Sequence, residues 1–218
     1  MNTEEKTIIK TLNKIGVDTR FISLYKDNIY INNLKFSKFS RKKEEEFQEL
    51  YPQINIIRSK IFQKICIKVS RTVKNQIKPR QTLYIKNDES IENILLYILL
   101  EPYKRKYGIK ITDKKEKKHI IVSNNCLDDF TIKYIDLMTN AEQITNKLEE
   151  NRIYPLTHVP HQWITDWATT NNINYKKTKK YDETISNEII NFLEKHIPNV
   201  QESIIQSVNY LDENNNKR

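Results

Sequence analysis

Residues 82–100 read TLYIKNDESIENILLYILL. A short β-prone run, a polar turn and an apolar run with helical spacing predict a strand, a loop and a helix. A phosphate-binding loop at this place needs glycines, so that backbone N–H groups can approach the phosphates, and a helix that begins without negative charge. The loop has neither feature and consists of Asn87, Asp88, Glu89, Ser90, Ile91 and Glu92. It therefore predicts a degenerate nucleotide loop.

The flanking sequence predicts alternating helices and strands. Apolar residues recur every fourth position from Ile57 to Ile77, which indicates an amphipathic helix that ends before Pro79. One long helix is expected to end near Tyr107-Gly108. Further strands are expected at 109–112, 119–123 and 152–154, and further helices at 128–140, 161–171, 185–196 and 199–211. This alternation predicts an α/β fold with a parallel sheet flanked by helices.

Residues 1–55 differ in pattern from the rest of the chain. They predict a helix over 3–14, a hairpin within 20–33 and a charged linker or exposed helix over 37–49. The expected organisation is an N-terminal appendage, 1–55, followed by an α/β domain with C-terminal helices, 56–218.

The chain is basic. It has 37 Lys and Arg against 28 Asp and Glu, a net charge of +9, which favours a polyanionic partner such as nucleic acid. The alternative is that the lysines reflect only a skewed composition, rich in Lys, Asn and Ile and poor in Gly. The candidate contacts for nucleic acid are Lys104, Arg105, Lys106, Lys176, Lys177, Lys179 and Lys180.

Cysteine and histidine usage gives no metal or redox motif. Cys66 and Cys126 form no Cys-x-x-Cys pair, and His158 and His161 flank Pro160 without further ligands nearby. We expect no metal and no cofactor. No run approaches the length of a membrane span and the start lacks the features of a signal peptide, so the expected location is the cytoplasm.

Three segments resemble the PP-loop tRNA thiolation enzymes. The first comprises Ile-Lys-Pro at 77–79, the strand at 83–85 and Leu-Leu at 95–96, which sets the family's loop Ser-Gly-Gly-Lys-Asp-Ser against residues 87–92. The second, residues 120–129, resembles a strand followed by Gly-His-Asn-x-Asp-Asp, with Asp128 and Asp129 at the acidic pair. The third, residues 153–207, is similar to the C-terminal part of two-thiouridine synthases.

The resemblance implies a PP-loop fold with a degenerate nucleotide site. It implies a pseudoenzyme that lacks the loop and the catalytic cysteines, like the non-catalytic subunits of tRNA 2-thiolation complexes. Such a subunit pairs with an active PP-loop subunit, binds tRNA and works with a ubiquitin-like sulfur carrier on the wobble uridine of Lys, Glu and Gln tRNAs. Two alternatives stay open: a divergent but active ATP-dependent tRNA-modifying enzyme that uses Asp128 and Asp129 for magnesium, and a protein-interaction module with no RNA role.

Overall fold

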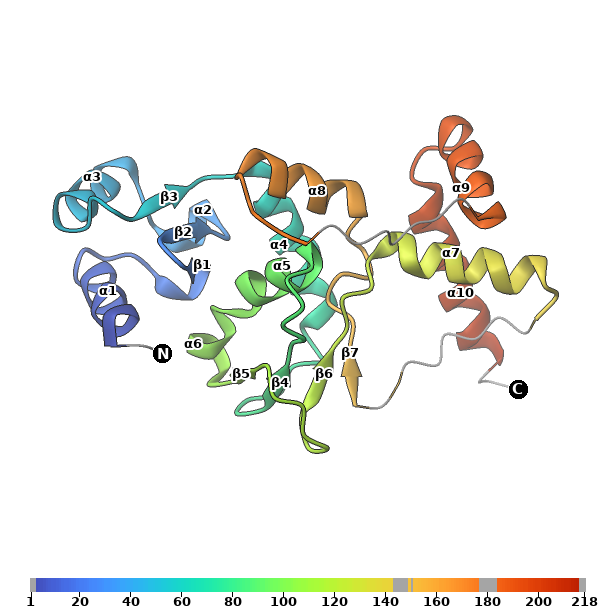
Figure 1. Ribbon diagram of the computed structural model, residues 1–218, viewed down its shortest axis with the longest axis horizontal. Coiled ribbons are helices and arrows are strands. Elements are labelled where there is room, and N and C mark those ends of the chain that lie inside the picture. Colours follow the sequence, from blue (N-terminus) through green and yellow to red (C-terminus); the bar gives the residue numbers. More distant parts are fainter. Residues whose placement is uncertain (1–2, 143–148, 150, 177–183, 216–218) are drawn as a thin grey trace.

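The protein is built around two β-sheets. The computed structural model describes residues 3–142, 149, 151–176 and 184–215 (Figure 1). The strands are β1 (Ile22–Tyr25), β2 (Asn28–Ile31), β3 (Asn55–Ile57), β4 (Thr82–Tyr84), β5 (Lys110–Thr112), β6 (Ile120–Val122) and β7 (Arg152–Ile153). The α-helices are α1 (Thr3–Lys14), α2 (Leu34–Ser37), α3 (Arg41–Leu50), α4 (Lys60–Val73), α5 (Ile91–Leu100), α6 (Tyr103–Tyr107), α7 (Leu127–Thr139), α8 (His161–Thr170), α9 (Ile185–His196) and α10 (Val200–Asn215).

The first sheet has the order β1-β2-β3 and its own hydrophobic core. β1 and β2 form the predicted hairpin, and Lys26 in its turn has a positive φ of 51°. β3 pairs parallel with β2. The charged stretch 37–49 is not a linker, because most of it forms α3 and Phe47 on this helix is fully buried in the core of the first sheet. Glu44 on the same helix is also buried and pairs with Arg58 at 2.7 Å, so α3 is held by an apolar contact and an ion pair.

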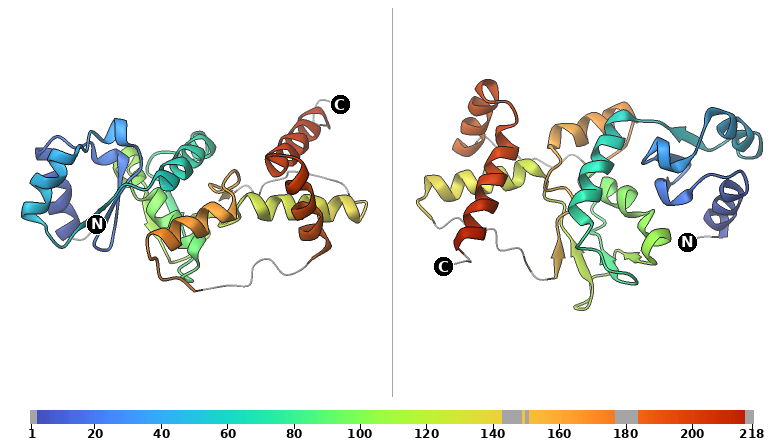
Figure 2. Two further views of the ribbon diagram at one scale, coloured as in Figure 1. Left: turned by 90° about the horizontal axis from the view of Figure 1, so that it is seen from above. Right: turned by 180° about the vertical axis from the view of Figure 1, so that it is seen from behind.

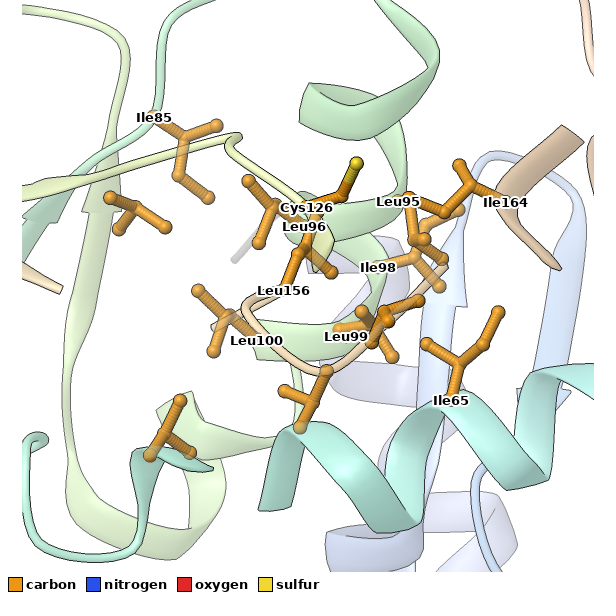
Figure 3. Close-up of a cluster of buried hydrophobic side chains, with 14 of the residues drawn as sticks. Ile65, Ile85, Leu95, Leu96, Ile98, Leu99, Leu100, Cys126, Leu156 and Ile164 are labelled. Atoms are coloured by element: carbon orange, nitrogen blue, oxygen red, sulfur yellow. The ribbon is translucent and has the colours of Figure 1, made fainter. Parts of the chain in front are cut away.

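The second sheet has the order β5-β4-β6-β7, and every pairing in it is parallel. The parallel α/β sheet predicted from the alternating pattern is confirmed. Helices α4, α5 and α8 pack together with Leu83 of β4 in one large core (Figure 3). This core contains most of the apolar face of α5, including Leu95, Leu96 and Leu99.

The long helix predicted to reach Gly108 is instead two helices. α5 ends at Leu100, Glu101 and Pro102 follow, and α6 begins at Tyr103. Proline has no N–H to continue the hydrogen-bond ladder and its ring crowds the preceding turn, so the chain changes direction there. Gly108 caps α6 with a φ of 65°, a conformation that glycine adopts without strain.

Helices α7, α9 and α10 form a third group with a small core of their own (Figure 2). α7 follows β6, yet it contacts α9 and α10 rather than lying along the sheet. Leu127, Phe130 and Tyr134 of α7 pack against Ile205 and Val208 of α10. No helix in the described residues is long and apolar enough to cross a membrane.

A buried ion pair joins the junction of α5 and α6 to the first sheet. Glu101 accepts from Arg105 at 2.8 Å and from the backbone N–H of Leu24 in β1 at 3.1 Å. Arg105 also donates to the carbonyl oxygens of Thr19 and Ile22, at 2.9 and 2.7 Å. The Glu101 and Arg105 side chains are only 4% and 11% exposed, so each needs the other for charge compensation.

Glu101→Ala should therefore destabilise the fold strongly. It leaves the Arg105 charge buried without its partner, and removing one member of a buried pair costs about 3–5 kcal/mol. Urea denaturation followed by circular dichroism measures the free energy of unfolding. Lys118→Gln is the control, because it removes only the exposed pair with Glu116, and its midpoint should match that of the unaltered protein. Equal midpoints for both variants would contradict the role assigned to Glu101.

Candidate functional site

A cavity of about 410 Å³ lies at the carboxyl ends of β4 and β5. In open parallel sheets this edge is where ligands bind. Tyr25 of β1 forms one wall, so both sheets contribute residues to the cavity. The lining residues are Tyr25, Ile85, Lys86, Asn87, Glu89, Asn93, Ile94, Tyr97, Ile111, Thr112 and Asp113.

The cavity combines aromatic and apolar surface with a few polar groups. The rings of Tyr25 and Tyr97 lie 6.0 Å apart between centroids, and the ammonium of Lys104 lies 4.9 Å from the Tyr97 ring. Ile85, Ile94 and Ile111 add apolar surface, and Asn87 and Thr112 add hydrogen-bonding groups. Concave sites of this composition and size bind small organic ligands, and a nucleoside has the matching flat ring and polar edge.

The loop beside the cavity satisfies the start of α5 with its own side chains. The Ser90 hydroxyl accepts from the backbone N–H of Asn93 as the helix cap. The Asp88 carboxylate accepts from the Ser90 N–H at 3.1 Å and from the Asn93 amide at 2.7 Å, and it lies 3.2 Å from the Lys86 ammonium. Three N–H donors and the Lys86 ammonium, all of which could meet a phosphate, are thus already used by protein groups.

The pKa of Asp88 follows from these contacts. Burial raises the pKa of this carboxyl, but hydrogen bonds from Asn93 and Ser90 and the neighbouring Lys86 outweigh burial, and the pKa lies well below its usual range. Asp88 is therefore a carboxylate at neutral pH, where it opposes the approach of an anion.

The backbone at Glu89 keeps a conformation that glycine prefers. Its φ is 57°, in the left-handed region, and its carbonyl accepts from the N–H of Lys176 at 2.9 Å. Matching the loop on Leu95-Leu96 sets Glu89 against the second glycine of the PP-loop motif. A left-handed φ is strained for a residue with a side chain, and glycine adopts it without strain.

The acidic pair after β6 is engaged in local structure. Asp129 accepts from the N–H of Cys126 at 2.6 Å, and Asp128 accepts from the N–H of His161 at 2.6 Å. The His161 ring lies 3.6 Å from buried Glu92 of α5. Both aspartates thus cap helices α7 and α8. Among the described residues no group of three or more His, Cys, Asp or Glu could hold a metal ion.

The residues proposed for tRNA have different surroundings in the structure. Arg105 is engaged in the buried pair with Glu101, so its charge is not available to a phosphate. Lys104 and Lys106 lie against aromatic rings, with the Lys106 ammonium 4.5 Å from the Phe21 ring and 5.1 Å from the Tyr103 ring. Burial lowers the pKa of Lys106. Lys176 is described, and Lys177, Lys179 and Lys180 lie outside the described residues.

Comparison with known proteins supports the fold. The structure resembles the U34-tRNA thiolase NcsA from Methanococcus maripaludis, solved with its [4Fe-4S] cluster, at a TM-score of 0.56 and 15% identity over 76% of this chain and 83% of that one. The chain has the fold of a PP-loop tRNA thiolase. No family model matches the sequence.

One sequence relative is a "Probable sulfurtransferase" of Methanocaldococcus jannaschii. It is 34% identical over 93 residues, which are 42% of this chain and 27% of that protein. The chain thus spans about a quarter of the length of this relative.

The comparisons correct one prediction from the sequence. The lost glycines and cysteines predicted a pseudoenzyme, and that prediction is wrong, because the matched proteins are named as enzymes, a sulfurtransferase and a tRNA thiolase. The altered loop of residues 87–92 does not by itself mark a chain without activity.

The iron–sulfur cluster of the thiolase does not fit this chain. Such clusters are held by several cysteine thiolates, and this chain has two cysteines. Cys66 lies on α4 and Cys126 at the start of α7, in different parts of the main core. Burial also raises the pKa of the Cys66 thiol, which disfavours the thiolate that would bind iron.

Asp88→Ala should lower stability in a pH-dependent way. A depressed pKa means that the carboxylate stabilises the folded state above the unfolded value near 3.8, and that this stability is lost as pH falls through the folded pKa. At pH 7 the loss should be about 1 kcal/mol, since the site is partly exposed. Denaturation between pH 7 and pH 2 should show the two proteins converging at low pH. A constant difference across that range would contradict the ionised role of Asp88.

Proposed function

We propose that this chain acts in the thiolation of tRNA, at the wobble uridine of Lys, Glu and Gln tRNAs, as an enzyme subunit in the cytoplasm that pairs with a second PP-loop subunit. Sulfur would reach the site from a ubiquitin-like carrier. The observation that carries the proposal is the cavity at the β4 and β5 ends in a chain with the fold of a U34-tRNA thiolase. Its likeness to a sulfurtransferase over 93 residues supports the same chemistry.

The cavity suits the nucleoside part of ATP, the substrate that activates a uridine oxygen in this reaction class. Tyr25 and Tyr97 offer rings against which a base packs, and Asn87 and Thr112 offer groups for its polar edge. Burying a planar base beside aromatic rings is favourable without any charge contact.

The phosphates meet a different environment. A carboxylate about 4 Å from a phosphate charge costs about 4 kcal/mol at an effective dielectric of about 20, and Asp88 is ionised. A cation supplied with the nucleotide or by the paired subunit would offset this repulsion. We therefore expect adenosine and AMP to bind this chain better than ATP when it is alone.

The basic balance of the chain supports tRNA as the partner. A net charge of +9 attracts phosphate backbones, and such binding weakens as salt rises. Lys104, Lys106 and Lys176 remain candidate contacts in the described part of the chain, and Lys177, Lys179 and Lys180 remain predictions. Arg105 does not.

Asn87→Trp should abolish nucleoside binding while leaving the fold intact. Asn87 is exposed at the cavity wall, so an indole can occupy the space without disturbing the core. Isothermal titration with adenosine and AMP should give binding for the unaltered protein and none for the variant. Asn87→Ser is the matched control and should retain binding.

The same preparations test the wider proposal. Unaltered protein and both variants should retain labelled tRNA in filter binding at low salt and release it as salt rises. If none of the three proteins bound a nucleoside, the cavity would not be a nucleoside site. Absence of salt-sensitive tRNA binding would favour an interaction module without an RNA role.

A further inference from the structure

One face of the second sheet packs into the main core, and the other carries side chains that belong to none of the hydrophobic clusters of the described residues. Parallel sheets are normally covered by helices on both faces. Here Leu83, Val122 and Ile153 point into the main core, together with the half-buried Ile111 and Ile120. These five residues share one face, because Leu83 pairs with both Ile111 and Ile120, and Val122 pairs with Ile153.

The opposite face carries a different set of side chains. Tyr84 pairs with Thr112 on one side and Ile121 on the other, Ile121 pairs with Arg152, and Thr82 pairs with Lys110. Tyr84 and Ile121 are half-buried and belong to none of the hydrophobic clusters of the described residues. We call this surface the open face, and it consists of Thr82, Tyr84, Lys110, Thr112, Ile121 and Arg152.

The chain connections explain why the described helices give this face little cover. A right-handed crossover from β5 to β6 passes over the face opposite to α5, and residues 113–119 make it without a helix. α7, which follows β6, packs on α9 and α10 instead. Figure 1 views the strands from the side opposite to α4, and the view from behind in Figure 2 has α4 in front.

The connecting loop brings positive charge to the open face. His119 lies two residues before Ile121, so it shares this face, and its ring nitrogen lies 3.1 Å from the carbonyl oxygen of Lys114. The loop therefore lies over the open face beside the start of β6. Residues 110–118 contain five lysines and two acidic residues, a net charge of +3. Their lysines are Lys110, Lys114, Lys115, Lys117 and Lys118.

Cations also occur at the far side of the open face. Lys110 lies on the edge strand β5 and Arg152 on the edge strand β7, three strand spacings apart, about 14 Å at 4.7–4.9 Å each. Arg152 lies 3.1 Å from Glu149, but its Nε is covered and has no acceptor in the part of the chain that the structure describes. Tyr84, on a central strand, lies between these two cations.

We propose that the open face binds a single-stranded segment of RNA, with a base stacked on Tyr84 and the backbone phosphates on Lys110, Arg152 and the lysines of residues 114–118. The inference rests on the proposed function in taking tRNA as the source of that RNA. Sheets that bind single-stranded RNA work by stacking bases on aromatic side chains between cations.

RNA fits the open face better than a protein does. Stable protein interfaces have an apolar centre depleted of charge. Here the apolar side chains are Tyr84 and Ile121, and cations lie on both edges and on the adjoining loop. This composition complements a polyanion with flat bases.

The test measures binding of a fluorescein-labelled 12-nucleotide single-stranded RNA and of a folded tRNA transcript by anisotropy. Tyr84→Ala should weaken binding of the single strand about tenfold, as loss of one base–aromatic stack does. Tyr84→Phe keeps the ring and should bind normally. Tyr210→Ala, on the exposed end of α10, is the matched control and should also bind normally.

Thermal melting will show whether Tyr84→Ala is folded. If it is not, charge variants test the proposal instead. Lys110→Gln and Arg152→Gln should each lower the slope of log affinity against log salt by about one. Normal RNA binding by all the open-face variants would overturn the inference and leave the proposed function intact. Absence of RNA binding by the unaltered protein would overturn both. Protection of the open face by a protein partner but not by RNA would also overturn the inference.

Discussion

The buried pair of Glu101 and Arg105 holds the two sheets in one arrangement. It sits where α5 gives way to α6, and it bonds to the backbone of residues 19–24 from there. The candidate cavity depends on this arrangement, because Tyr25 comes from the first sheet and the remaining walls come from α5, the loop before it and the end of β5. A buried pair is expensive to desolvate, and here it acts together with Tyr30 of β2, which is fully buried in the main core against Phe62 and Trp167.

The loop at residues 87–92 uses its own side chains to stabilise the start of α5. Its backbone includes a left-handed residue at Glu89, but its side chains cap α5 and place the Asp88 carboxylate near the cavity. In a phosphate-binding loop the N–H donors stay free for a ligand. Here the donors are bonded to side chains of the loop, and these bonds stabilise the start of α5.

The sequence predicted the order and type of most elements, because hydrophobic spacing and turn residues are local signals. The strands of the second sheet and the helices α7, α8 and α9 follow these signals closely, whereas α4 is shorter than the helix predicted from Ile57 to Ile77, and Ile57 itself belongs to β3. The break before α6 was missed although Pro102 marks it, because the apolar pattern continues through Tyr103.

Long-range features could not be read in the same way. Arg105 looked like one of three surface cations, and only its partner 4 residues away and the backbone of β1 make it internal. The contact of Tyr25 with Tyr97 joins β1 of the first sheet to α5, and the open face depends on where α7 packs. No spacing in the sequence encodes these placements. The matched enzymes, likewise, corrected a prediction drawn from missing glycines and cysteines.

The most direct measurement is the content of 2-thiouridine in tRNA from cells that lack this chain, determined by mass spectrometry of digested nucleosides. Wobble thiolation of the Lys, Glu and Gln tRNAs should fall sharply and return when the gene is restored, and Asn87→Trp should restore less than Asn87→Ser. Unchanged 2-thiouridine in cells without the chain would contradict its assignment to tRNA thiolation.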